Sequence, residues 1–178
     1  LYCKMLNEAV LRMKGDSRDG TDEFETVADL QIDAFIPDAY IRNEALKLDI
    51  YRRIAAVESE EERDDMLEEL IDRFGEPPKS VLNLLEITGL RGKAHRLYIK
   101  EVQGRPDRIV FTMYERARIN PAKIPQLIAS MDGAMTFRKS EPPQFIYEMK
   151  NSRKKYSGNL LEVTGQILDD MEILKEQE

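Results

Sequence analysis

The order of hydrophobic patterns along the chain constrains the fold most. Three helical patterns follow one another between residues 43 and 97, and strand patterns lie on both sides of them. Alternating apolar residues predict a half-buried strand through Ala28, Leu30 and Ile32, and Pro37 ends it. Because strands and helices do not alternate strictly, the sequence predicts an α+β fold with helices packed on a small, mostly antiparallel sheet.

The second helical pattern has the clearest ends. Ser59 followed by Glu62 forms a capping box that predicts its start. Gly75 supplies a left-handed position after the helix, and Pro77 and Pro78 prevent its continuation. The apolar residues at helical spacing predict the buried face: Met66, Leu67, Leu70, Ile71 and Phe74.

Other helices and strands are predicted on both sides of this element. One helix is expected from about Asn43 to Ala56, and a continuous one from about Pro78 to Leu97, although Gly89 and Gly92 weaken it by about 1 kcal/mol each. Strands are expected over 97–104, 108–114, 134–139 and 144–150, a short helix over 120–131, and an acidic helix over 159–178.

The N-terminal region predicts a domain boundary. Residues 1–14 have helical spacing and are interpreted as the tail helix of a preceding domain. Residues 15–25 are polar and contain glycine, which is typical of a linker, and residues 26–178 are expected to form one C-terminal domain. Because the sequence starts at Leu1 inside a helical pattern, we expect it to be a piece of a larger protein.

Composition narrows the class of protein. Cys3 is the only cysteine, so no internal disulfide can form, which is typical of a reducing, cytoplasmic setting. No apolar run reaches the roughly 20 residues of a membrane span. The formal net charge of −7 and the pI near 5.0 disfavour a nucleic-acid-binding domain, which is usually basic.

The motif search predicts no catalytic, cofactor-binding or metal-binding residue. The phosphate-binding loop G-x-x-x-x-G-K-[ST], the nucleophile motif G-x-S-x-G and the zinc motifs H-E-x-x-H and C-x-x-C are missing. His95 and Cys3 have no motif around them, and we interpret both as structural residues. The acidic run over 58–70 is interpreted as a solvated helix face favoured by the helix dipole. Two short basic clusters, over 91–96 and 152–155, are a weak signal for nucleic acid.

The end of the second helix is the exception. Glu69 and Arg73 are spaced as an i, i+4 ion pair, which on its own would contribute about 0.3–0.5 kcal/mol. Asp72 lies in the last turn, where the helix dipole disfavours negative charge. A locally unfavourable acid beside an arginine raises the hypothesis that Glu69, Asp72 and Arg73 form an interdomain interface, as an alternative to a purely structural role.

The segment over 33–99 resembles the C-terminal domain of the bacterial transcription-repair coupling factors (Mfd), and residues 1–10 resemble the end of the helicase core that precedes this domain in the family. The elements that carry the resemblance are "IP..YI", "YRRIA" and "ELIDRFG..P", in the family's order and spacing. The similarity covers about Leu1 to Gly104 and is looser beyond. It implies a parent that is an ATP-dependent DNA translocase, displaces stalled RNA polymerase and recruits the excision-repair protein UvrA.

The same resemblance implies a role for this segment. The family's C-terminal domain packs on a UvrB-like N-terminal module and covers the UvrA-binding surface, and its contact residues fall on Glu69, Asp72 and Arg73 here. The first hypothesis is therefore a non-catalytic, autoinhibitory interaction domain without a cofactor, which reaches DNA, RNA polymerase and UvrA only through the parent. The alternatives are an accessory nucleic-acid-binding module and an enzyme that uses the acidic helix.

Overall fold

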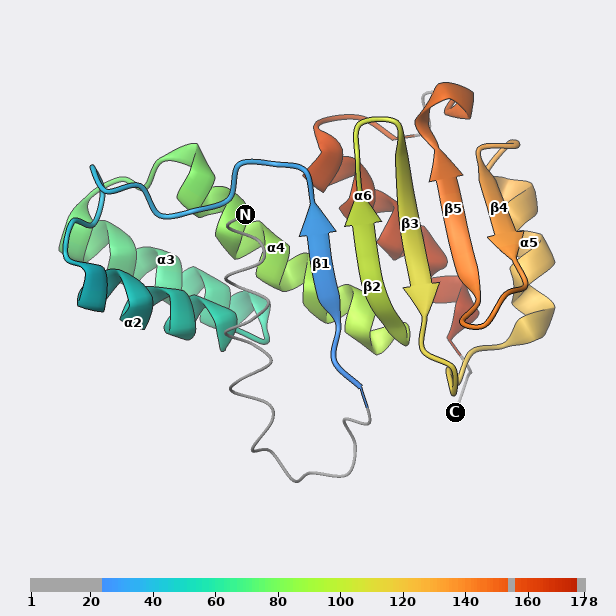
Figure 1. Ribbon diagram of the computed structural model, residues 1–178, viewed down its shortest axis with the longest axis horizontal. Coiled ribbons are helices and arrows are strands. Elements are labelled where there is room, and N and C mark those ends of the chain that lie inside the picture. Colours follow the sequence, from blue (N-terminus) through green and yellow to red (C-terminus); the bar gives the residue numbers. More distant parts are fainter. Residues whose placement is uncertain (1–23, 154–155, 176–178) are drawn as a thin grey trace. The chain divides into compact units, whose positions relative to one another are not determined.

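The computed structural model describes residues 24–153 and 156–175 (Figure 1). These residues form two compact units. The first, Ile32–Gly92, is here named the helical unit, and the second, Phe24–Gln31 with the described part of Lys93–Glu178, is named the sheet unit. The tail helix and most of the linker expected over 1–25 lie outside the described residues, as does Cys3. The expectation of one domain over 26–178 stays a prediction.

The helical unit contains α2 (Glu44–Ala55), α3 (Glu60–Phe74) and the part of α4 (Lys79–Arg96) up to Gly92. All three were predicted within one or two residues, and α4 is continuous through both of its glycines. The side chain of Asn43 accepts the N–H of Leu46 and so caps α2. The core of the unit comes from buried side chains of all three helices: Ile50, Ile54, Met66, Leu70, Val81, Leu84, Leu85, Ile87 and Leu90.

Helix α3 has the predicted cap at its start. The Ser59 hydroxyl accepts the N–H of Glu62 at 3.1 Å, and the Glu62 carboxylate accepts the N–H of Glu58 at 3.1 Å. The second bond therefore reaches one residue further back than a standard capping box. Both contacts satisfy backbone donors that the helix leaves without an internal partner.

Helix α3 ends as predicted, with one difference in backbone geometry. Gly75 has φ of 88° and ψ of −172°, so its φ is positive while its ψ is extended. That combination is open essentially to glycine alone. The Tyr40 hydroxyl lies 2.8 Å from the Gly75 carbonyl oxygen and 3.2 Å from that of Leu70, so it satisfies acceptors at the helix end.

The sheet unit holds one five-stranded sheet in the order β1-β2-β3-β5-β4. The strands are β1 (Val27–Leu30), β2 (Ile99–Gly104), β3 (Arg108–Met113), β4 (Met135–Arg138) and β5 (Gln144–Glu148). Only the β1–β2 pair is parallel, because β1 precedes the helices and β2 follows them; the other three pairs are antiparallel. The predicted α+β class with a mostly antiparallel sheet is confirmed.

In Figure 1, the helices α5 (Ile124–Ser130) and α6 (Leu160–Asp170) cover one face of the sheet. Phe111, Phe145 and Tyr147 are fully or almost fully buried in the unit's core. The last predicted helix is shorter than expected, because α6 ends at Asp170 and a 3-10 turn, Met171–Leu174, follows. Lys175 then forms an isolated bridge with Ile119.

The structure corrects the predicted buried face of α3, most clearly at Phe74. Met66 and Leu70 are buried, with Leu70 fully inaccessible, whereas Leu67, Ile71 and Phe74 are only partly covered. The Phe74 ring lies at the end of the helix, with its centroid 5.8 Å from that of Tyr40 and the Arg73 guanidinium 5.0 Å away. The ring therefore contributes to the helix end more than to the core.

We expect Leu70→Ala to lower the free energy of unfolding by about 2–5 kcal/mol, because it leaves a cavity in the closed core of the helical unit. Phe74→Ala should cost less than the roughly 3–5 kcal/mol typical of a buried phenylalanine. Urea unfolding of both variants measures the difference. An equal or larger loss for Phe74→Ala would contradict this assignment of the core.

Candidate interdomain interface

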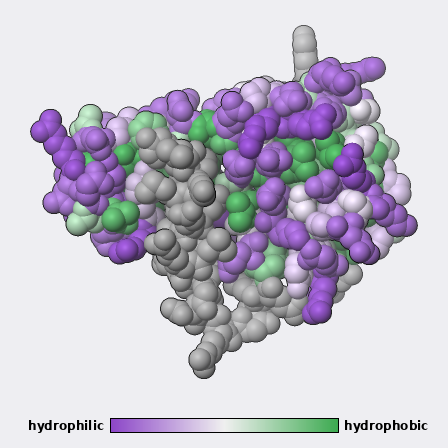
Figure 2. Space-filling model, in the orientation of Figure 1, coloured by the Kyte–Doolittle hydropathy of each residue, from purple (hydrophilic) through white to green (hydrophobic). Residues whose placement is uncertain are grey.

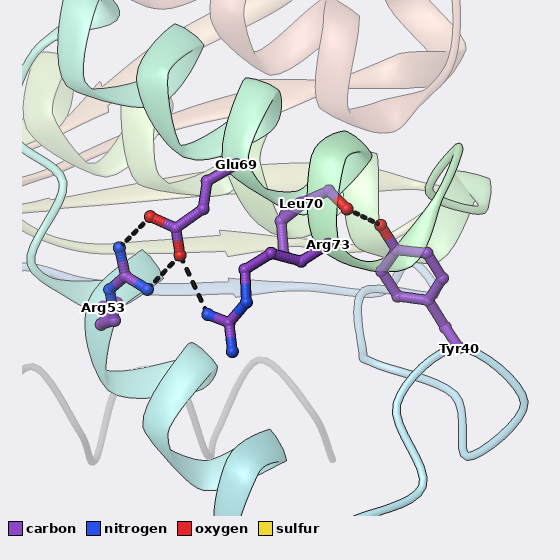
Figure 3. Close-up of polar contacts among 5 residues, drawn as sticks. All are labelled: Tyr40, Arg53, Glu69, Leu70 and Arg73. Carbon is purple, nitrogen blue, oxygen red and sulfur yellow. Dashed lines mark hydrogen bonds and ion pairs between the residues drawn. The ribbon is translucent and has the colours of Figure 1, made fainter.

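The predicted interface residues lie on the last two turns of α3, and they differ in the hydrogen bonds and ion pairs that they form. Figure 3 shows the Glu69 carboxylate pointing between two arginines, Arg73 on its own helix and Arg53 on α2. The Arg73 guanidinium donates to Glu69 at 3.1 Å, which confirms the predicted i, i+4 pair. Asp72 is exposed, and no other described residue contributes a hydrogen bond or ion pair to it.

Arg53 is the residue that sequence reasoning missed. Its two terminal N–H groups donate to the two carboxylate oxygens of Glu69, which is the bidentate geometry that favours arginine over lysine. This contact joins α2 to α3 across 16 sequence positions. The two adjacent arginines Arg52 and Arg53 in the last turn of α2 were the available signal, but choosing between them needs the packing angle of the helices.

The arginines change the chemistry of Glu69. The pKa of Glu69 is lowered from 4.5 to about 2, mainly by the hydrogen bonds from Arg53 and then by those from Arg73. Both arginine side chains remain about two-fifths exposed, at 41% and 42%. The cluster of Arg53, Glu69 and Arg73 is therefore a partly solvated surface network, and its individual pairs contribute modestly to stability.

A shallow groove adjoins this cluster. It has a volume of about 220 Å³ and runs between α2 and α3, with Arg53 and Glu69 at one end. Val57 and Met66 supply apolar walls, and Asp65 adds a second carboxylate. Enclosed small-molecule sites are larger, roughly 300–1,000 Å³, so the size suits a single side chain from a partner.

The rest of α3 presents acids to solvent, as predicted. Its first turn holds Glu60, Glu61 and Glu62, where the helix dipole favours negative charge. The helical unit contains 15 acidic and 8 basic residues, so the negative charge of the chain is concentrated there. In Figure 2 the surface over α2 and α3 is mainly hydrophilic. In the part of the chain that the structure covers, no group of three acidic, histidine or cysteine side chains could hold a metal ion.

His95 has a structural role in the sheet unit. The Thr26 hydroxyl donates its one hydrogen to the Ile99 carbonyl at 2.7 Å. It therefore accepts a hydrogen bond from the N–H of His95 Nδ1 at 2.9 Å. The ring of Phe24 packs against His95 in a tilted arrangement, with centroids 4.4 Å apart, and stacks on Tyr114 at 4.5 Å. These contacts anchor the segment before β1 and give His95 its structural role.

The first basic cluster is largely used by the fold. Arg91 is buried in the helical unit and donates to the Ala55 carbonyl at 3.3 Å. Lys93 pairs with Asp169 in the sheet unit at 2.7 Å. Of the second cluster, Lys154 and Lys155 lie outside the described residues. None of the described helices has the length and hydropathy of a membrane span.

Comparisons with known proteins agree with one another. The model of the TRCF domain matches residues 30–124, just over half of the chain. The transcription-repair-coupling factor of Bacillus subtilis is 36% identical over 117 residues, and that of Escherichia coli is 32% identical over 125. These matches cover 66% and 68% of this chain but only 10% and 11% of the relatives, so the chain spans about a tenth of their length.

A solved structure shows the same fold. The crystal structure of the C-terminal domain of transcription-repair coupling factor superposes with a TM-score of 0.69 at 24% identity. The match covers 85% of this chain and 94% of that one. The similarity therefore includes the looser second half of the chain, which the sequence resemblance left uncertain.

We expect Glu69→Gln to remove a pH-dependent part of the stability. Because the folded-state pKa of Glu69 is lowered to about 2, its contribution is present above pH 4.5 and is lost as the pH falls towards 2. Urea unfolding between pH 2 and pH 7 compares wild type with this variant and with the control Glu68→Gln on the exposed face of α3. Identical pH profiles for wild type and Glu69→Gln would contradict the assignment.

Proposed function

Because the chain belongs to the TRCF domain family, we propose that it is a non-catalytic, autoinhibitory domain of a transcription-repair coupling factor. In this proposal the domain packs on the UvrB-like module of its parent through Glu69, Asp72 and Arg73, and it covers the surface that UvrA would bind. The parent is an ATP-dependent DNA translocase that acts on stalled RNA polymerase. The domain, in the cytoplasm, meets DNA and polymerase only through the parent.

The observation that carries the proposal is Asp72. It lies in the last turn of α3, where the helix dipole disfavours a carboxylate, and no other described residue pairs with it. Within the described residues no contact uses this acid, whereas a basic partner can pair with it. Asp72 also lies within one turn of Glu69 and Arg73, so the three charges can meet one partner surface.

The alternative, an accessory nucleic-acid-binding module, has weaker support. Phosphate binding needs several cations that face one way. Arg91 and Lys93 are already engaged within their own units, and the acidic helical unit would repel a phosphate backbone. We therefore favour a protein partner with a basic surface.

The proposed contact between this domain and the UvrB-like module is here named the latch. The replacement of Glu69, Asp72 and Arg73 by alanine together should open the latch in the full-length parent. Tethering gives an effective concentration on the order of millimolar, so an intrinsic Kd of ~10 µM would keep the latch closed about 99% of the time. A loss of about 3 kcal/mol weakens that contact ~150-fold. UvrA should then bind on the order of 50-fold more tightly, because its apparent affinity follows the open fraction.

The matched control replaces Arg42, Glu60 and Glu61 by alanine. All three residues are exposed, and their replacement removes the same net charge. Circular dichroism and thermal unfolding establish that both triple variants fold. Equal UvrA affinity for wild type, both triple variants and a parent without this domain would rule out autoinhibition.

A further inference from the structure

Glu69 is already engaged by two arginines in the structure of this chain. A carboxylate has about four acceptor positions. Arg53 takes one on each oxygen, and Arg73 takes another on Oε2. One position remains, on Oε1, so a partner arginine that binds both oxygens of Glu69 must displace an arginine that already holds it.

The two arginines are about equally exposed, and Arg53 is the one with a second carboxylate on its own helix. Its side chain is 41% exposed, so it can rotate without disturbing the core. Asp49 lies four residues earlier on α2, is exposed, and exerts an attraction on Arg53. An acid four residues before a base is the favourable orientation for an i, i+4 helix pair. Arg53 thus has a second carboxylate within reach on its own helix.

The groove provides the path for the incoming cation. Val57 and Met66 form apolar walls that suit the methylene stem of an arginine, which commonly packs on apolar surface while its head group stays polar. Asp65 and Glu69 supply carboxylates along the same groove. The groove therefore complements one long cationic side chain in both shape and charge.

We propose that closing the latch is an exchange of arginines on Glu69: an arginine of the UvrB-like module enters the groove between α2 and α3, and Arg53 moves from Glu69 to Asp49. This inference rests on the proposed function, since it names the partner chemistry at the same surface. Arg53 is then an internal competitor that limits how tightly the latch closes. Asp49 has the opposite effect, because it stabilises the displaced position of Arg53.

The test measures UvrA affinity for the full-length parent with single substitutions in this domain. Arg53→Gln removes the competitor, so the latch should close more tightly and UvrA should bind about two- to fivefold more weakly, the range expected for one exposed ion pair. Asp49→Asn removes the alternative partner of Arg53, so UvrA should bind about two- to fivefold more tightly. Glu61→Gln, which is exposed on the first turn of α3, is the matched control and should change nothing.

The double variant Arg53→Gln with Glu69→Gln separates competition from other effects. If Arg53 acts through Glu69, the double variant should have the same UvrA affinity as Glu69→Gln alone, and both should bind UvrA more tightly than wild type. Tighter UvrA binding by Arg53→Gln would overturn the exchange, because it would show that Arg53 supports the closed latch. If the alanine triple variant of the interface also leaves UvrA affinity unchanged, the proposed function fails as well; if only the Arg53 and Asp49 effects are missing, the exchange alone fails.

Discussion

The site depends on how α3 ends. Gly75 takes a positive φ that places the chain in a new direction, and the Tyr40 hydroxyl satisfies carbonyl groups that the last turn leaves unpaired. This termination fixes the turn that carries Glu69, Asp72 and Arg73. No side chain would collide with a Cβ at position 75, so the need for glycine there is conformational rather than steric.

Local signals predicted the elements well. The cap at Ser59, the stop at Gly75 and the strands β4 and β5 follow from short-range chemistry that a sequence displays directly. The contact of Arg53 with Glu69 and that of Tyr40 with the end of α3 could not be predicted, because each depends on where two separate elements meet. Phe74 was placed in the core because its spacing matched the apolar face, but spacing does not show that a helix end extends past its neighbours.

The negative charge of the chain is unevenly divided between the two units. The helical unit holds the excess of acids, and much of it lies on α3 beside the groove. Arg53 and Arg73 interrupt that negative surface at one point and hold Glu69 there. In the proposed interface, the overall charge would favour a basic partner at long range, and the geometry of a single carboxylate would favour it at short range. Its strength can be adjusted by residues that never touch the partner.

Direct titration of this chain with the UvrB-like module of the same parent tests the central claim. The account predicts saturable binding with a Kd of ~10 µM at low salt. Binding should weaken as salt is raised, because the partners carry opposite charge, and Asp72→Asn should weaken it further without changing the thermal stability of the chain. No binding at module concentrations on the order of millimolar, or binding that Asp72→Asn leaves unchanged, would contradict the claim that this end of α3 is an interdomain interface.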